Sequence, residues 1–510
     1  MSYAKLKLEF GDYQTPGELA AACCRVLARL GIKPRAILEP TCGVGGFLKA
    51  GVECFSGAEA AKGFDINDEY VGVARRNLEK LGSRASVAIE RADFFDVDWT
   101  ALVNSLPQPL LVVGNPPWVT NAALGRVGSE NLPAKSNFQG HAGLDAITGK
   151  GNFDISEYML IRLSESLQGK DASLAMLCKT AVARKLMAYC WKRGLEMGGC
   201  HIFPIDAQRD FGASVEACLF VASFNGKSTD RSCIVHEDFD LTTQCIHLGY
   251  RDGLLISDLE KYEVWRFLRG KSAYTWRSGV KHDCANVMEF TEQDGGLVNG
   301  LGEKVEIEDS FLYPLLKSSA VAGSVKAGKR QVLVTQRRVG DGTSAIAQVA
   351  PKTWRYLLDH AEWLDKRASI IYRKRPRFCV FGVGEYSFST WKVAISGFYK
   401  KLEFRAVGPS SGRAVMLDDT SYFLSCNDEI EAQLLTEMLN STPSRELLSS
   451  LIFWDAKRPI TVDVLSQLSL ERLAAHLGQS GALNNASEHR RPRCVQSDLF
   501  DNSISSWPPR

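Results

Sequence analysis

The chain has 510 residues, of which 45% are hydrophobic and 24% charged, so it is long enough for several globular domains with at least one large core. A formal net charge of +2 excludes a uniformly basic protein, and any nucleic-acid surface must come from local clustering. No run of roughly 18 apolar residues predicts a membrane span. The first residues lack a secretory pattern and the cysteines lack metal-binding spacings. We therefore expect a cytoplasmic protein with reduced thiols and no metal site.

A turn-rich segment, residues 11–16, precedes the first predicted helix. Thr15 is a good helix N-cap, and Pro16 suits the first helical position. The helix is predicted from Gly17 to Leu30. Capping alone explains this segment unless the rest of the chain gives it a ligand.

A glycine-rich loop follows the first predicted strand, Ala36–Leu38. The loop contains Glu39, Pro40, Thr41, Gly43, Gly45 and Gly46. Such glycines let a backbone approach a ligand closely and lead into a helix N-terminus. The spacing matches neither the dinucleotide fingerprint nor a phosphate loop, and a carboxylate at Glu39 repels phosphate. The loop therefore favours a ligand with a cationic end or ribose hydroxyls.

Two further predicted strands end beside acidic residues. The first runs into Asp65 and Ile66, about twenty residues past the glycines, where nucleotide-binding folds place a carboxylate on ribose hydroxyls. The second precedes Asp93 and Phe94, which suit an adenine amino group and an adenine ring. A solvated acidic turn is the alternative for Asp93.

The fourth predicted strand, Leu110–Gly114, ends in Asn115, Pro116, Pro117 and Trp118. Its continuous apolar run is typical of a buried parallel strand, and ligands bind at the carboxyl ends of such strands. The two prolines stiffen the turn and remove two N–H donors. The Asn115 side chain and the Pro116 carbonyl are then acceptors beside the flat face of Trp118, which suits a planar group bearing –NH2. The alternative is an ordinary proline turn with Trp118 in the core.

Taken in order, these segments predict a doubly wound α/β sheet that carries a nucleoside cofactor beside an amino-group site. The combination resembles the gamma-class adenine-N6 DNA amino-methyltransferases of restriction–modification systems, a branch of the class I (Rossmann-like) S-adenosylmethionine-dependent methyltransferases. The resemblance covers about the first 225 residues and rests on residues 13–16, 40–47, 65, 93–94 and 115–118. Trp118 departs from the more usual Tyr or Phe and still offers a stacking face.

The resemblance implies S-adenosylmethionine as cofactor, duplex DNA as substrate and a target adenine that is flipped out of the helix. Its catalytic residues would be Asn115, Pro116, Pro117 and Trp118. Asn115 and Pro116 would accept the two amino hydrogens, with Trp118 on one face of the base and Phe211 on the other. A core position is the alternative for Phe211. The expected cofactor contacts are Tyr13, Thr15, Pro16, Glu39, Pro40, Thr41, Gly43, Gly45, Asp65, Ile66, Asp93, Phe94 and Asn115.

The remaining pattern suggests how the chain is divided. We expect a catalytic domain over residues 1–225, a connector over 226–280, a C-terminal mixed α+β target recognition domain over 281–477 and a disordered tail over 478–510. Residues 119–152 are expected to form a mobile loop over the active site or a disordered segment. Strands are predicted over 378–383 and 391–395 and a helix over 428–440.

Two basic groups in the C-terminal half are candidates for DNA contact. Residues 366–377 hold six Lys and Arg residues and no acid. The expected phosphate contacts are Lys329, Arg330, Arg337, Arg338, Arg373, Lys374, Arg375 and Arg377. A solvated basic face is the alternative.

Duplex DNA is thus the expected partner of an expected monomer, with a separate cognate restriction endonuclease as a candidate partner and no fused nuclease. Two rival functions stay open. One is another amino-methyltransferase, acting on rRNA guanine-N2 or on protein glutamine-N5; the other is a catalytically inactive DNA-binding subunit. The basic C-terminal half argues against a glutamine enzyme, and the intact motif set argues against an inactive subunit.

Overall fold

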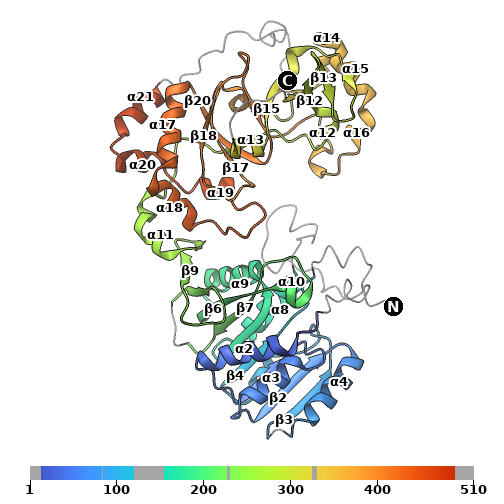
Figure 1. The fold of residues 1–510 in the computed structure, drawn as a ribbon, viewed down its shortest axis with the longest axis vertical. Helices are drawn as coiled ribbons and strands as arrows, with labels where there is room; N and C mark the ends of the chain where they lie inside the picture. The colour runs from blue at the N-terminus through green and yellow to red at the C-terminus, as the bar shows by residue number, and fades with distance from the viewer. Residues whose placement is uncertain (1–12, 83, 120–153, 227–229, 324–329, 489–510) are drawn as a thin grey trace. The chain divides into compact units, whose positions relative to one another are not determined.

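The computed structural model describes residues 13–82, 84–119, 154–226, 230–323 and 330–488. The chain divides into two compact units, Met1–Leu259 and Glu260–Arg510, which we call the N-terminal unit and the C-terminal unit. Figure 1 shows the elements of each. Within the described ranges, no helix has the length and apolar character needed to cross a membrane.

A ten-stranded sheet forms the centre of the N-terminal unit, in the order β10-β9-β8-β6-β7-β5-β4-β1-β2-β3. Its strands are β1 (Ala36–Glu39), β2 (Ala60–Asp65), β3 (Ser86–Arg91), β4 (Leu110–Gly114), β5 (Ala172–Lys179), β6 (Gly198–Ile205), β7 (Ala217–Ser223), β8 (Ser232–His236), β9 (Cys245–Arg251) and β10 (Leu254–Ile256). Strands β1 to β5 pair in parallel, whereas β7 is antiparallel to both β5 and β6. The strand order reverses between β1 and β4, the point at which open α/β sheets bind ligands.

Helices cover both faces of this sheet (Figure 1). One layer consists of α2 (Gly17–Arg29), α3 (Gly46–Cys54) and α4 (Asp68–Glu79), and the other of α5 (Trp99–Ser105), α8 (Ile155–Ser166) and α9 (Thr180–Arg193). The short helix α10 (Ala207–Phe211) joins β6 to β7. The predicted doubly wound α/β fold is confirmed.

Strand β4 shows why its sequence is continuously apolar. Residues Leu110 to Val113 are at most 1% exposed. Leu111 and Val113 belong to the core cluster beneath α2, α3 and α4, whereas Leu110 and Val112 point to the opposite face. A parallel strand with helices on both sides has no solvent face, so the alternation of polar and apolar residues disappears.

Residues 232–256 correct the expected connector. They form β8, β9 and β10, which extend the sheet beyond β6, and the division between the units falls after Leu259 rather than near residue 225. Strand β8 pairs in parallel with β6. Without this extension β6 would be an edge strand with unpaired backbone N–H and C=O groups, which is a liability for a folded sheet.

The C-terminal unit contains two sheets. The four-stranded sheet has β11 (Arg277–Ser278), β20 (Ser421–Cys426), β17 (Trp391–Ser396) and β18 (Arg405–Val407); the six-stranded sheet has β14 (Lys304–Val305), β13 (Gly296–Asn299), β12 (Glu289–Gln293), β16 (Arg330–Leu333), β15 (Leu312–Leu316) and β19 (Met416–Leu417). Its helices are α11 (Leu259–Trp265), α12 (Ala285–Met288), α13 (Ser318–Ala322), α14 (Ile346–Val349), α15 (Pro351–Asp359), α16 (Ala361–Asp365), α17 (Glu429–Asn440), α18 (Thr442–Ser450), α19 (Val462–Leu465), α20 (Leu470–His476) and α21 (Ser480–Glu488).

Two expectations for this unit are wrong. Residues 378–383 form no strand: Phe378 and Gly382 have positive φ values of 64° and 70°, and Phe381 makes only an isolated bridge to Lys281. The expected disordered tail begins with helix α21, which packs on α17 and α20 and whose Leu483 is 4% exposed. The helix predicted over 428–440 and the strand predicted over 391–395 are confirmed as α17 and β17.

The burial of β4 predicts a large stability effect at its centre. Leu111→Ala removes a fully buried side chain and leaves a cavity, so it should lower the free energy of unfolding by about 2 to 5 kcal/mol. Ile246→Ala, at a side chain of the same unit that is 53% exposed, should change it by less than about 0.5 kcal/mol. Urea titration of both variants measures this difference. Equal unfolding midpoints would contradict the two-sided burial of β4.

Candidate active site

Asn115 lies directly after β4, at the point where the strand order reverses. Its Nδ2 donates a hydrogen bond to the backbone carbonyl of Tyr13 at 3.1 Å. Its Oδ1 is buried, and no described residue donates a hydrogen bond to it. A buried acceptor without a donor costs about 1–3 kcal/mol. This oxygen is therefore a ready acceptor for a ligand that brings an N–H group.

Three aromatic side chains of this region pack on one another. Tyr13 lies 5.8 Å from Trp118 and 5.9 Å from Phe211 between ring centroids, and Trp118 and Phe211 lie 5.1 Å apart with planes at 70°. Trp118 is 5% exposed and Phe211 6%, and both belong to the core cluster. The structure thus brings these predicted residues together as mutually packed rings.

Lys179 and Asp154 support the tetrapeptide Asn115–Trp118, and the sequence analysis assigned neither residue to the site. Lys179, the last residue of β5, donates from Nζ to the Trp118 carbonyl at 3.1 Å and forms an ion pair with Asp154 at 2.5 Å. Asp154 is also the N-cap of α8, because its carboxylate accepts from the amide of Ser156. In the sequence, the contact between Lys179 and the Trp118 carbonyl is indicated only by a lysine at the carboxyl end of an apolar strand.

The glycine loop contacts the N-terminal segment. Gly43 has a φ of +50°, and a Cβ there would lie 2.5 Å from Gln14 Oε1, which itself accepts from the Val44 amide at 3.2 Å. Gly45 caps α3 at a φ of +83° without a side-chain cap bond. A Cβ at Gly46 would lie 3.4 Å from the Thr15 carbonyl. The loop is therefore a close-fitting cradle that leads into the N-terminus of α3.

Asp65 ties the end of β2 to this loop. Its Oδ2 accepts from the Gly43 amide at 2.8 Å, and its Oδ1 accepts from the Asn67 amide at 2.8 Å. The next residue, Ile66, is 39% exposed, an apolar side chain open to solvent at the ligand-binding edge of the sheet. Asp65 therefore sets the loop geometry and remains half-buried beside it.

Glu39 joins the end of β1 to helix α3 at the same edge of the sheet. It is 3% exposed, and its Oε2 accepts from the Leu48 amide of α3 at 3.0 Å. Burial raises the pKa of Glu39, and the nearby Asp65 carboxylate raises it further. A cationic ligand would favour its ionised form. Pro40 is buried and Thr41 half-buried just beyond it, and Pro16 is the N-cap of α2.

Asp93 and Phe94 follow β3, the edge strand of the sheet. Asp93 Oδ1 accepts from the Phe95 amide at 2.9 Å, and Phe94 is 6% exposed and packs on Trp99 at 4.7 Å between centroids. Within the described chain, no hydrogen bond or ring contact joins either residue to Asn115. Their described contacts are therefore local, with Phe95 and Trp99.

The predicted phosphate contacts divide into two kinds. Arg337 and Arg338 both pair with Glu385, Arg377 pairs with Asp365 at 2.7 Å, and Arg330 lies 3.8 Å from Glu289. Arg373, Lys374 and Arg375 are exposed, and no described carboxylate pairs with them; we call these three residues the basic turn. Lys374 has a positive φ of 59°. Lys329 and all but the first residue of the loop expected over residues 119–152 lie outside the described residues.

Comparison with known proteins adds to this geometry. No family model matches the chain. The Type IIL restriction-modification enzyme MmeI, solved in complex with DNA, is 12% identical over 93% of this chain and 73% of its own, with a TM-score of 0.49. A type I restriction-modification methyltransferase subunit from Streptococcus thermophilus is 16% identical over 45% of this chain and 47% of its own, with a TM-score of 0.31.

One relative is far more similar. The Type II methyltransferase M.NspV of Nostoc sp. (strain ATCC 29411 / PCC 7524) is 46% identical over 472 residues, which cover 92% of this chain and 98% of that protein. The match therefore includes both units. The chain belongs to the Type II methyltransferases, the DNA methyltransferases of restriction–modification systems.

Proposed function

We propose that this protein transfers a methyl group from S-adenosylmethionine to the N6 amino group of an adenine in duplex DNA, which protects host DNA in a restriction–modification system. The buried Oδ1 of Asn115 carries the proposal, because this acceptor lies at the ligand-binding edge of the sheet and no described residue satisfies it. An exocyclic amino group supplies the donor that it lacks.

The tetrapeptide is suited to hold that amino group. Adenine N6 bears two hydrogens; Asn115 Oδ1 accepts one, and the Pro116 carbonyl accepts the other. Neither Pro116 nor Pro117 has an N–H that would compete for the acceptors. Two such bonds localise the nitrogen lone pair and aim it away from the ring plane, so the amine becomes a positioned nucleophile.

The cofactor site fits a nucleoside with a cationic end. When bound, S-adenosylmethionine supplies an electrophilic methyl group on its sulfonium. The glycine cradle allows close backbone approach, Asp65 offers carboxylate oxygens to ribose hydroxyls, and exposed Ile66 offers an apolar contact to a purine ring. The remaining expected contacts are Tyr13, Thr15, Pro16, Glu39, Pro40, Thr41, Asp93 and Phe94.

Entry of the base requires the aromatic rings to move. The amino group of a paired adenine is engaged in the duplex, so the target must be flipped out. A base stacked between two rings needs about 7 Å between them, two contacts of roughly 3.5 Å. Trp118 and Phe211 lie 5.1 Å apart between centroids. We infer that the extruded base separates Trp118 from Phe211 and takes up part of their mutual packing.

The basic turn is the proposed phosphate contact in the C-terminal unit. The paired arginines must give up a carboxylate before they bind a phosphate, whereas the basic turn has no such competitor among the described residues. Lys374 has a positive φ of 59°, a backbone conformation uncommon for a residue with a side chain, which places a sharp turn between the two arginines. We therefore assign most of the salt-dependent DNA affinity to Arg373, Lys374 and Arg375.

Asn115→Ala should lower kcat by at least roughly 100-fold, because it removes a hydrogen bond that strengthens as the nitrogen becomes nucleophilic. DNA affinity should persist. The measurement is single-turnover methyl transfer to duplex DNA, with 2-aminopurine at the target position reporting extrusion. Asn104→Ala, at an exposed side chain of α5, is the matched control. Wild-type transfer rates in Asn115→Ala would refute this role.

Asp65→Ala should weaken S-adenosylmethionine binding by roughly 1.5–3 kcal/mol, since it removes a charged hydrogen-bond acceptor and loosens the glycine loop. Isothermal titration calorimetry without DNA measures the affinity. Glu90→Ala, at an exposed carboxylate on the neighbouring strand β3 that pairs with Lys62 at 3.0 Å, should bind as the wild type does. Unchanged affinity in Asp65→Ala would remove Asp65 from the cofactor site.

Replacing Arg373, Lys374 and Arg375 together with Ala should weaken DNA binding and flatten its salt dependence by about 0.9 for each lost phosphate contact. Fluorescence anisotropy over a series of salt concentrations gives the slope. Arg377→Ala, whose guanidinium is already paired with Asp365, should change the slope less. If the triple variant keeps the wild-type slope, the phosphate contacts lie elsewhere.

A further inference from the structure

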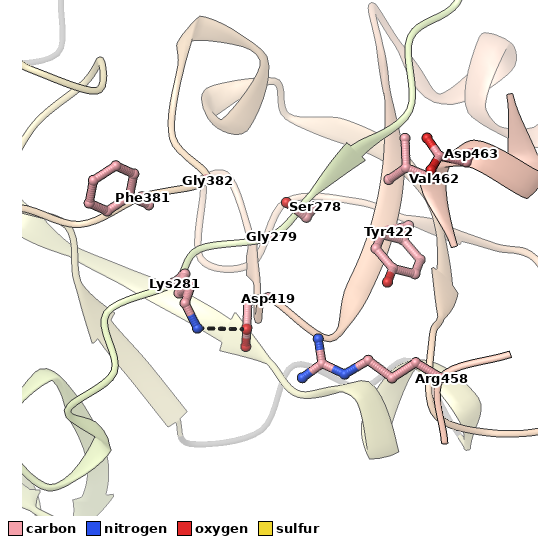
Figure 2. Close-up of a pocket in the computed structure, with 10 residues that line it drawn as sticks. All are labelled: Ser278, Gly279, Lys281, Phe381, Gly382, Asp419, Tyr422, Arg458, Val462 and Asp463. Carbon is pink, nitrogen blue, oxygen red and sulfur yellow. Dashed lines mark hydrogen bonds and ion pairs between the residues drawn. The ribbon is translucent and has the colours of Figure 1, made fainter. Parts of the chain in front are cut away.

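A pocket of about 350 Å³ opens within the C-terminal unit, and its lining includes no residue assigned above to chemistry or cofactor binding. Figure 2 shows its polar side chains: Lys281, Asp419, Tyr422, Arg458 and Asp463, with the ring of Phe381 at one end. Lys281 follows β11, Asp419 and Tyr422 lie just before and within β20, Arg458 lies in the segment between α18 and α19, and Asp463 lies in α19. Segments far apart in the sequence therefore converge on one cavity.

The backbone around this pocket is tightly fixed. The Gly279 amide donates to the Ser421 carbonyl at 3.0 Å, and the Val280 amide donates to the Leu417 carbonyl at 2.7 Å. Gly382 has a φ of +70°, and a Cβ there would lie 2.1 Å from the Gly279 carbonyl oxygen. Only glycine permits this close crossing. The pocket wall is thus preformed, as a recognition site requires.

The two cationic side chains of the pocket differ in their partners. Lys281 is neutralised by Asp283 at 2.7 Å and by Asp419 at 3.5 Å. Arg458 makes no hydrogen bond or ion pair with any described residue; its guanidinium lies 4.8 Å from the centroid of the Phe398 ring. Figure 2 shows it extending toward the Lys281–Asp419 pair. Arg458 is the donor group that the pocket leaves for a ligand.

This mixture of charges selects the chemistry of the ligand. Asp419 and Asp463 line the same pocket, and carboxylates repel a phosphate. An uncharged heterocycle with acceptors and donors along one edge suits an arginine beside a carboxylate. Guanine presents O6 and N7 as two adjacent acceptors in the major groove, which a guanidinium contacts with two parallel hydrogen bonds. The paired cytosine presents an amino donor that a carboxylate accepts.

The basic turn adjoins this pocket. The Tyr372 hydroxyl donates to the Lys281 carbonyl at 3.3 Å, and the Tyr372 ring packs edge-on against Phe381 at 5.3 Å between centroids. Arg373 follows Tyr372 directly in the chain. Phosphate contacts set the register of a duplex, and base-edge contacts read its sequence. The two kinds of group therefore lie side by side in this unit.

We propose that Arg458 determines one guanine of the recognition sequence, donating to O6 and N7 of that base, while Asp463 accepts from the amino group of the paired cytosine. The proposal rests on the proposed function, because it names the part of the DNA substrate that the C-terminal unit reads. It makes Arg458 a specificity-determining residue that takes no part in methyl transfer.

The test begins with the recognition sequence, obtained by sequencing methylated adenines in DNA from cells that express the wild-type protein. Absence of adenine methylation would refute the proposed function itself. A recognition sequence without guanine would overturn only the assignment of Arg458. Duplexes are then made in which 7-deazaguanine, which lacks the N7 acceptor, replaces each guanine in turn, and affinity is measured by fluorescence anisotropy.

The wild type should lose affinity at one guanine position, and Arg458→Ala should bind the unmodified duplex roughly 5- to 150-fold more weakly while being indifferent to 7-deazaguanine at that position. Arg458→Lys, which keeps the charge without the two-pronged donor, should resemble Arg458→Ala. Arg355→Ala, whose guanidinium pairs with Asp359 at 3.2 Å, should keep the wild-type profile. Salt slopes should be the same for all of these variants.

Two results would overturn the inference while leaving the proposed function intact. One is an Arg458→Ala protein that is folded, as judged by its urea midpoint, and keeps the wild-type sensitivity to 7-deazaguanine at every position. The other is a uniform loss of affinity with a flatter salt slope, restored by Arg458→Lys, which would make Arg458 a phosphate contact instead.

Discussion

The hydrogen bond from Asn115 Nδ2 to the Tyr13 carbonyl is the interaction on which the candidate active site depends. It uses the donor side of the amide and so leaves the acceptor side, Oδ1, buried and unsatisfied. An amide turned the other way would place two oxygens against each other. The N-terminal segment therefore does more than begin the first helix, because its backbone orients the side chain that follows β4.

A buried acceptor without a donor persists only on a rigid support. The support here comes from three sources: β4 is covered on both faces, two prolines stiffen the turn, and Lys179 holds the Trp118 carbonyl from the neighbouring strand. The cost of the unmet hydrogen bond is balanced by this packing, and a ligand amino group removes it. The site is thus built to gain free energy when the proposed substrate arrives.

In the protein alone, the aromatic rings contact one another and several charged groups are paired within the protein. Tyr13, Trp118 and Phe211 pack on one another and cover the core, and the proposed target base would separate Trp118 from Phe211. In the C-terminal unit, several arginines are satisfied by carboxylates, while the basic turn and Arg458 have no such partner among the described residues. A chain whose net charge is only +2 can therefore still present local groups suited to DNA.

The sequence by itself determined the first half of the sheet and the position of its ligand edge. The reason is local: an apolar run such as Leu110–Gly114 needs burial on both faces, and the glycines and prolines that follow such runs restrict the backbone whatever surrounds them. The family resemblance added the order of the motifs, and the relationship to a Type II methyltransferase agrees with it.

Only the tertiary structure decided which distant groups meet. The local sequence of residues 232–256 does not predict an extension of the sheet. The extension pairs the backbone N–H and C=O groups of β6, which would otherwise lie at a sheet edge. Residues 378–383 have the apolar composition of a strand, yet positive φ values at Phe378 and Gly382 interrupt the extended backbone. The same holds for the partners of Lys179 and Gln14 and for the distinction between paired and unpaired arginines. These depend on contacts between residues far apart in the chain, which local composition does not encode.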